Sequence, residues 1–258
     1  MSILNAFNPN ETPLINAAHF CQPIDGFPKI AVGAFKAIEP FLEARHAEEL
    51  AVMRLAGWNV PIWRVNHKGT NIAVFHAPLG GSAVVALAEE IRIMGAEQFL
   101  FFGSCGTLDR DVTAGKIIIP TAAYRDEGTS YHYAPPDNSY IEVKTAHALH
   151  QILTALGLPC ALTKTWTTDA FFREMPSAIA ARRAEGCGVV EMECASIMAM
   201  AQFYGMPAYQ MLFPEDCLDG TEWERGSMGS LAQSELERCF ALSLEVAHQL
   251  SQTGESNK

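Results

Sequence analysis

The stretch CGVVEMECAS, residues 187–196, joins one apolar run to the start of another. Its two valines are typical of the end of a buried strand, and the run 195–201 is typical of the start of a helix. Two carboxylates, Glu191 and Glu193, stand at the junction. A buried carboxylate costs free energy unless something pairs with it, so the stretch predicts that these two side chains hold a partner.

Similar apolar runs, rich in β-branched and aromatic residues, alternate with helical patterns along the chain. The apolar runs predict strands over 29–33, 60–65, 71–77, 98–103, 116–120, 161–166, 188–192 and 208–213. The helical patterns predict helices over 36–56, 82–94, 143–156, 176–186, 193–204 and 229–251. This alternation predicts an α/β sandwich around one mixed sheet, with the ligand beyond the carboxyl ends of the strands.

The composition excludes several classes of protein. With 49% hydrophobic residues, the 258-residue chain can bury one sizeable core. The net charge is −11 and no basic run is present, which argues against a nucleic-acid partner. No apolar run approaches the roughly 18 residues that span a membrane, and the first residues lack the pattern of a secretory signal. Seven scattered cysteines without a CxxC pair fit reduced thiols in a cytoplasm, with no zinc framework.

Four loops are expected at strand ends, over 77–82, 103–108, 166–176 and 213–220. In the second loop, glycines let the backbone approach a ligand and Ser104 offers a hydroxyl, although a plain turn explains the same residues. In the third, Phe171 could stack on a planar ligand or simply fill the core. The fourth gathers three acids, which would either bind a heterocycle or form a solvated acidic loop.

Four motifs, taken together, carry a resemblance that none carries alone. They are GSCGTLD (103–109), RDEGTSYHY (125–133), TDAFF (168–172) and VVEMECAS (189–196). In this order and spacing they resemble the family of purine nucleoside phosphorylases, uridine phosphorylases and methylthioadenosine nucleosidases. The resemblance covers about residues 28–220. It implies a three-layer α/β/α sandwich and an enzyme that cleaves the N-glycosidic bond of a nucleoside.

The resemblance assigns several of these residues to the sugar. Glu193 matches the glutamate that holds the ribose hydroxyls, and Met192 matches the residue that packs against the sugar. Glu191 is either the structural partner of Glu193 or a second sugar contact, and Ser104 matches a phosphate or ribose contact. Cleavage passes through an oxocarbenium-like cation, so a carboxylate on the ribose hydroxyls strengthens its hold as positive charge grows.

The resemblance assigns a second group to the base. Phe171 matches the stacking aromatic, Val190 belongs to the same base site, and Asp216 takes the place of the aspartate that protonates or hydrogen-bonds a purine at N7. A protonated acid there would ease departure of the base, which makes Asp216 and Glu193 the expected catalytic pair. Apolar neighbours of Asp216 could raise its pKa. Met175 and Ser177 stand where uridine phosphorylases carry Gln and Arg, which favours a purine.

The nucleophile site departs from the family pattern. Phosphorylases of the family hold phosphate with three arginines, and the aligned places here hold Phe101, Ala37 and Trp58. A doubly charged phosphate needs charge-assisted donors. Replacement candidates for the phosphate site are Gly33, Lys36, Ser104, Arg125 and the helix start at 81–82.

The sequence is therefore compatible with more than one reaction. The expected one is phosphorolysis of a purine nucleoside, with inorganic phosphate as co-substrate and no metal or organic cofactor. The first alternative is a nucleosidase that uses water; its catalytic glutamate aligns with Ile38, one residue short of Glu39. The second alternative is a catalytically weak nucleoside-binding module.

Residues 28–258 are predicted to form a single domain, preceded by a segment, 1–27, that is a candidate for a subunit interface. The resemblance implies a homo-oligomer, either a dimer or a trimer of dimers, in which neighbours complete each site. Leu14 stands at the place of the family's N-terminal His. The expected partner is a nucleoside, without nucleic acid polymer or membrane.

Overall fold

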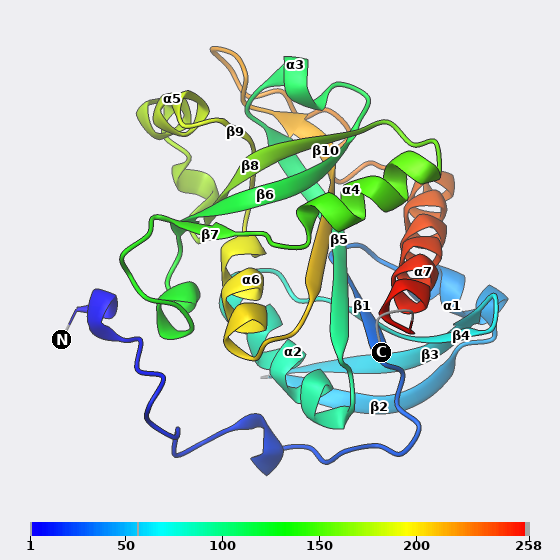
Figure 1. Cartoon of the computed structure of the whole chain (residues 1–258). Coiled ribbons are helices and arrows are strands. Elements are labelled where there is room, and N and C mark those ends of the chain that lie inside the picture. Colours follow the sequence, from blue (N-terminus) through cyan, green and yellow to red (C-terminus); the bar gives the residue numbers. More distant parts are fainter. Residues whose placement is uncertain (1, 56, 256–258) are drawn as a thin grey trace. The chain divides into compact units, whose positions relative to one another are not determined.

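The computed structural model describes residues 2–55 and 57–255, and these form a mixed α/β fold around a mixed β-sheet (Figure 1). Two compact units can be distinguished within the chain. The first unit comprises the residues up to Thr12, Leu79–Val85 and Gly103–Ser230. The second unit comprises Pro13–Pro78, Ala86–Phe102 and the residues from Leu231 onward.

The first unit contains five strands and the second half of a sixth. They are β6 (Ile117–Asp126), β7 (Tyr140–Glu142), β8 (Cys160–Thr168), β9 (Cys187–Glu191), β10 (Ala208–Cys217) and the end of β5 (Gln98–Thr107). Their order is β10-β6-β8-β9-β5, with β7 beside β6. β6, β8 and β9 run parallel, whereas β9 meets the end of β5 in antiparallel register, with Val190 opposite Gly106.

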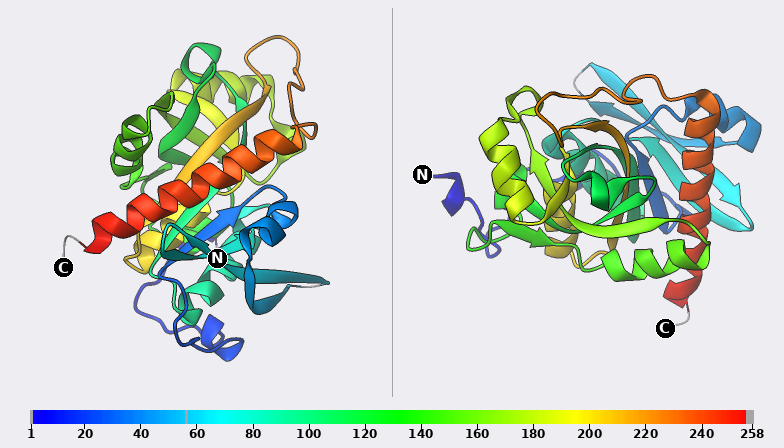
Figure 2. Two further views of the ribbon diagram at one scale, coloured as in Figure 1. Left: turned by 90° about the vertical axis from the view of Figure 1, so that its right-hand side faces the viewer. Right: turned by 90° about the horizontal axis from the view of Figure 1, so that it is seen from above.

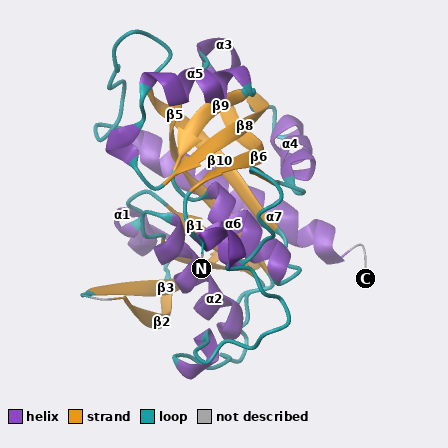
Figure 3. Ribbon diagram, turned by 90° about the vertical axis from the view of Figure 1, so that its left-hand side faces the viewer, coloured by secondary structure: helices purple, strands orange, loops and turns teal. Residues whose placement is uncertain are grey.

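The helices of the first unit follow its strands. They are η1 (Ile3–Asn5), α3 (Arg110–Thr113), η4 (Thr129–His132), α4 (Ala146–Ala155), η5 (Phe171–Arg173), α5 (Pro176–Ala184) and α6 (Cys194–Phe203). Pro176 opens α5, where its missing N–H costs no helical hydrogen bond. α5 packs on β9 (Figure 3). α6 is buried from Cys194 to Ala201, as expected for a helix that is apolar on all sides.

The second unit contains the remaining elements. They are η2 (Ala17–His19), β1 (Ile30–Ala34), α1 (Glu39–Leu42), η3 (Glu43–Arg45), β2 (Glu48–Leu55), β3 (Trp58–His67), β4 (Thr70–His76), the start of β5, and α7 (Gln233–Glu255). Helix α2 (Gly81–Met94) begins in the first unit and ends in the second. β1 lies between β4 and β5 in parallel register, fully buried, and α7 packs along β1, β4 and β3 (Figure 2).

The α/β class and the mixed sheet are confirmed, but the helix predicted over 36–56 is wrong. His46 takes a left-handed backbone conformation, with φ of 50°, and ends the helical segment after η3. The next residues form β2, which pairs antiparallel with β3 so that Leu55 lies opposite Trp58. The segment has enough apolar residues for either structure, and pairing with β3 decides between them.

Two predicted loops are parts of strands. β5 runs through 103–106 to Thr107, and β10 runs through 213–216 to Cys217. The short strand β7 was not predicted. All eight predicted strands and the helices that correspond to α2, α4, α5, α6 and α7 are confirmed, although β5, β6 and β10 continue four to six residues beyond their predicted ends. Of the helices that the structure describes, none is long and apolar enough to cross a membrane.

Candidate active site

Glu191 is the fixed point of the site. It ends β9 and is almost fully buried. One carboxylate oxygen accepts the backbone N–H groups of Glu193 and Cys194 at 2.8 and 2.6 Å. The other accepts the hydroxyls of Thr167 and Thr165 at 2.5 and 3.2 Å. These four hydrogen bonds hold the start of α6, whose first N–H groups have no partner within the helix.

Glu193 lies beside this anchor, is 4% exposed and precedes the first residue of α6. Its Oε1 accepts the backbone N–H of Gly80 at 2.7 Å. Burial raises the pKa of its carboxyl above the ordinary value, and the charge of Glu191 raises it further. A carboxylate has about four acceptor positions, so Glu193 keeps capacity for hydroxyl groups of a ligand.

Glu127 belongs to the RDEGTSYHY motif and follows the last residue of β6; it is a buried carboxylate to which sequence reasoning gave no role. Its Oε2 accepts the backbone N–H of Ser130 at 2.9 Å and the hydroxyl of Ser196 at 2.5 Å. Its Oε1 is buried without a hydrogen-bond partner among the described residues. A Cβ on Gly81 would lie 2.1 Å from the Ser196 hydroxyl, so only glycine fits at the start of α2. In the sequence, the only indication of a role for Glu127 was its place within the RDEGTSYHY motif.

Phe171 lines a cavity of about 310 Å³, together with Phe172, Glu174, Leu218, Trp223 and Met228. The rings of Phe171 and Phe172 meet edge to face, with centroids 4.8 Å apart. The volume lies at the lower end of the range for small-molecule sites, and the lining is mostly apolar and aromatic. A planar, apolar-faced ligand matches this lining.

Asp216 adjoins this cavity through Trp223. It is 9% exposed, and its Oδ2 accepts the indole N–H of Trp223 at 2.7 Å. Burial raises the pKa of Asp216, and the bond from Trp223 partly opposes that shift. A Cβ on Gly106 would lie 3.2 Å from Oδ1 of Asp216 and 3.0 Å from the side chain of Val190. Gly106 therefore allows Asp216 and Val190 to approach the same point of β5.

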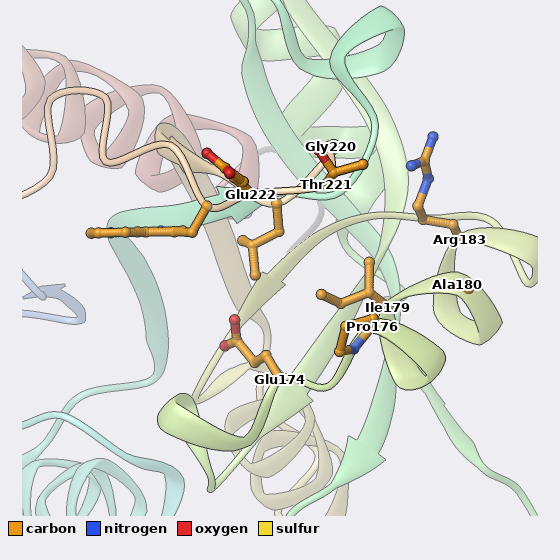
Figure 4. Close-up of a pocket in the computed structure, with 10 residues that line it drawn as sticks. Glu174, Pro176, Ile179, Ala180, Arg183, Gly220, Thr221 and Glu222 are labelled. Carbon is orange, nitrogen blue, oxygen red and sulfur yellow. The ribbon is translucent and has the colours of Figure 1, made fainter.

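A larger cavity of about 520 Å³ continues from the first one, because Glu174, Leu218 and Trp223 line both. Its other lining residues are Pro176, Ile179, Ala180, Arg183, Gly220, Thr221 and Glu222. In Figure 4 the side chain of Glu174 projects from the segment before α5 toward the segment that carries Thr221 and Glu222. The Arg183 guanidinium is paired with Asp219 at 2.5 Å.

Glu174 is the second carboxyl that sequence reasoning missed. Burial raises its pKa to about 7, and the charge of Asp216 adds to the shift. Its carboxylate has no hydrogen bond or ion pair within the part of the chain that the structure describes. The sequence places it three residues after Phe171, but no local pattern indicates that it faces a cavity.

The remaining predicted residues of the first unit are Ser104, Met192 and Arg125. Ser104 and Met192 are partly buried. The buried Arg125 guanidinium donates to the Ser130 hydroxyl and to the carbonyls of Ala134, Pro135 and Asn138, and it lies over the ring of Tyr131. These bonds engage most of the donors of Arg125 in holding the loop after β6.

Gly33 and Lys36, the other predicted phosphate residues, belong to the second unit. A Cβ on Gly33 would lie 2.5 Å from the ring of Phe101 and 2.8 Å from that of Phe75. Phe101 is fully buried and stacks on Phe35 and Phe99. The place of a family arginine is thus taken by an aromatic cluster that carries no charge.

Glu39 and His76 also lie in the second unit. An oxygen of the Glu39 carboxylate lies 3.0 Å from Nδ1 of His76, and the other accepts the backbone N–H of Ile38 at 3.0 Å. Both side chains are about half exposed. Across the described residues, no three His, Cys, Asp or Glu side chains are grouped so that they could hold a metal ion.

Comparison with known proteins adds three relatives. The chain is 27% identical over 150 residues to a guanosine phosphorylase of Halorubrum lacusprofundi, which covers 57% of this chain and 61% of that protein. It is 27% identical over 159 residues to a uridine phosphorylase of Thermococcus kodakarensis, which covers 55% and 56%. A uridine phosphorylase of Escherichia coli is 24% identical over 161 residues, or 57% and 64%. The matches span under two thirds of each of these relatives.

A solved structure and a family model extend the match to most of the chain. The structure of purine nucleoside phosphorylase from Toxoplasma gondii with immucillin-H has a TM-score of 0.73, with 18% identity, and covers 94% of this chain and 100% of that one. This likeness establishes the nucleoside phosphorylase fold. The model of the phosphorylase superfamily matches residues 32–248. The chain therefore belongs to the phosphorylase superfamily.

Proposed function

We propose that this protein is an enzyme that cleaves the N-glycosidic bond of a purine nucleoside, with phosphate as the acceptor, to give free base and a sugar 1-phosphate. The observation that carries the proposal is the pair of features in the first unit: the held carboxylate Glu193, and the aromatic cavity bounded by Phe171 and next to Asp216. The named phosphorylases among the relatives support the reaction class.

Glu193 would act on the sugar. As the glycosidic bond breaks, positive charge grows on the ribose ring. The pKa of Glu193 is raised in the free site, and hydrogen bonds from the ribose hydroxyls would favour its ionised form. An ionised Glu193 that accepts those bonds stabilises the positive charge more in the transition state than in the ground state. Glu191 fixes the turn that presents Glu193, because its four hydrogen bonds leave it little freedom. Met192 and Ser104 complete the proposed sugar contacts.

Asp216 would act on the base. The departing purine needs a proton at N7, and an acid with a raised pKa keeps that proton at neutral pH. Burial shifts the pKa of Asp216 in the required direction. Phe171 supplies the stacking surface, with Val190 close to Asp216 through Gly106. A buried acid of this kind suits a purine, whose N7 accepts a proton, better than a pyrimidine, which has no such atom.

Hydrolysis is the second candidate reaction, and one observation favours it. The buried stack of Phe101 on Phe35 and Phe99 offers no donor to a phosphate dianion. In a hydrolytic reaction, Glu39 would be the group that takes a proton from water, with its carboxylate supported by His76.

The test is release of base from adenosine and inosine, with and without phosphate. Release that requires phosphate, with a sugar 1-phosphate as product, establishes phosphorolysis. Release in phosphate-free buffer establishes a nucleosidase, and loss of that release in Glu39→Gln would identify the base. Ligand binding without release from either nucleoside would favour a binding module and contradict both reactions.

We further infer that the enzyme works in the cytoplasm as a homo-oligomer. The structure describes all seven cysteines and none of them forms a disulfide, which fits a reducing compartment. The large apolar side chains of Leu14, Ile15 and Trp58 are exposed in the single chain, and a subunit contact would cover them. Light scattering of the purified protein measures the mass, and a monomer at micromolar concentration would contradict the inference.

A further inference from the structure

Glu127 is a buried carboxylate that joins two segments of the first unit. Its Oε2 accepts the backbone N–H of Ser130, in η4, at 2.9 Å and the hydroxyl of Ser196, in α6, at 2.5 Å. Both serines are fully buried, and Glu127 is 7% exposed. Because a carboxylate only accepts hydrogen bonds, the Ser196 hydroxyl donates to Glu127, and the first turns of α6 are tied to η4.

Fold stability alone does not account for this acid. Oε1 of Glu127 is buried and has no hydrogen-bond partner among the residues that the structure describes. A buried polar atom without a partner costs free energy, and apolar side chains could fill the same volume without that cost. We therefore looked for a role of Glu127 in the site beside it.

Ser196 connects Glu127 to Glu193. It follows Glu193 by three residues, so both belong to the start of α6. The Ser196 hydroxyl also lies against the start of α2, since a Cβ on Gly81 would be 2.1 Å from it and 3.7 Å from Oε2 of Glu127. The residue before Gly81 is Gly80, which donates its N–H to Glu193 at 2.7 Å. A shift of Ser196 would therefore change the spacing of α2 and α6 at the point where Glu193 is held.

We propose that Glu127 is a positioning residue of the cleavage reaction: through the Ser196 hydroxyl it holds the start of α6 against the start of α2, and so fixes Glu193. This assignment rests on the proposed function. Glu127 itself would not touch the sugar, because its remaining oxygen is buried. Its contribution is the alignment of the Glu193 carboxylate, and a displacement of about 1 Å at such a group can lower a rate by about 100-fold.

The pKa of Glu193 provides a readout that a merely structural role would not move. Burial and the charges of Glu191 and Asp169 raise this pKa, whereas the hydrogen bond from Gly80 lowers it. If α2 and α6 separate, the bond from Gly80 weakens and the pKa of Glu193 rises further. The ionised form of Glu193 is the proposed active one, so the acid limb of the kcat/KM profile should then move to higher pH.

The test measures kcat, KM and the pH profile of kcat/KM for base release from adenosine and inosine in the presence of phosphate. Ser196→Ala removes the hydroxyl and keeps the acid. Its kcat should fall about tenfold, its KM should change less than about threefold, and its acid limb should rise by about one pH unit. Glu127→Leu should show the same changes. Glu127→Gln keeps a carbonyl oxygen that can accept both donors, and should restore most of kcat.

Asp109→Ala is the matched control. The Asp109 carboxylate also accepts two donors within the first unit, the N–H groups of Asp111 and Val112 at 3.0 and 3.3 Å, but it caps α3 and not α6. This variant should lower the melting temperature and keep the kcat and the acid limb of the wild type.

The outcomes separate the two proposals. Base release by the wild type, with either kcat or the acid limb unchanged in Ser196→Ala, would overturn the role of Glu127 and leave the proposed function standing. A Glu127→Gln variant as slow as Glu127→Leu, or equal changes in Asp109→Ala, would overturn it as well. If Glu127→Leu does not fold, Ser196→Ala and Glu127→Gln decide. No base release by the wild type from either nucleoside would overturn the proposed function, and the assignment of Glu127 with it.

Discussion

Glu191 and Glu174 are carboxyls of the same compact unit, yet the fold surrounds them differently. Glu191 is almost fully buried and accepts four hydrogen bonds, two from backbone N–H groups and two from threonine hydroxyls. Glu174 is partly buried and has no hydrogen-bond partner among the described residues. The acceptor positions of Glu191 are occupied by donors of the protein itself, whereas those of Glu174 remain available to a ligand.

The number of fixed donors around a carboxyl decides whether it supports the fold or remains available to a ligand. A carboxylate whose donors are fixed serves as an anchor, because moving it would leave several buried groups unpaired. A carboxyl without donors can change its protonation or its partner at little cost to the fold. Glu193 and Asp216 lie between these extremes, each with one strong donor, Gly80 or Trp223, and each with a raised pKa.

The largest expected effect is on catalysis. Glu193→Ala removes the carboxylate proposed to stabilise the sugar cation, and kcat/KM for nucleoside cleavage should fall about 100-fold or more. The melting temperature should change far less than in Glu191 variants, since Glu193 accepts one hydrogen bond from Gly80 but does not hold the start of α6. Turnover of every accepted nucleoside at the wild-type rate would show that Glu193 does not act on the sugar.

The next largest effect is on stability and tests whether Glu191 anchors the start of α6. Glu191→Leu leaves two backbone N–H groups and two threonine hydroxyls without their acceptor, so the free energy of unfolding should fall by about 3 kcal/mol. Glu191→Gln should cost less, because its carbonyl can face the N–H groups while the threonine hydroxyls accept from its amide. Urea unfolding of both variants gives the comparison, and equal losses would contradict the hydrogen-bond account.

A smaller effect concerns the acid on the base side. Trp223→Phe removes the indole N–H that donates to Asp216 and lowers its pKa. The pKa of Asp216 should therefore rise, and the protonated form should persist to higher pH. If that form is the active one, the alkaline limb of the kcat/KM profile moves to higher pH. A limb that stays in place, or moves to lower pH, would argue against Asp216 as the proton donor.

The smallest effect is on the pH dependence of stability. Glu174 has a folded pKa of about 7, above its ordinary value of 4.5, so the folded chain binds this proton more tightly than the unfolded chain. Its contribution to stability is highest below 4.5 and declines as pH rises through about 7. Glu174→Gln should remove this decline, which thermal melting across that window measures. An unchanged pH profile would mean that Glu174 is ionised as readily folded as unfolded.

Much of the fold follows from short-range sequence patterns. The fully buried β1, with the sequence IAVGA, and the apolar helix α6 were predicted because their residues leave few other arrangements. β2 was missed because the same residues suit a helix in isolation, and their pairing with β3 depends on a second segment. A local sequence pattern carries no information about the partner strand. Edge strands such as β2 and β7, which pair with a single neighbouring strand, are therefore hard to predict from it.

The candidate site divides in the same way. Glu191, Glu193 and Phe171 could be identified from the sequence, because they interrupt apolar elements or match motifs. The engagement of Arg125 by a loop, and the place of Glu174 in the lining of both cavities, became visible in the folded chain. Hydrogen-bond partners and cavity walls come from segments far apart in the chain, so the chemistry of a side chain depends on neighbours that lie outside its own stretch of sequence.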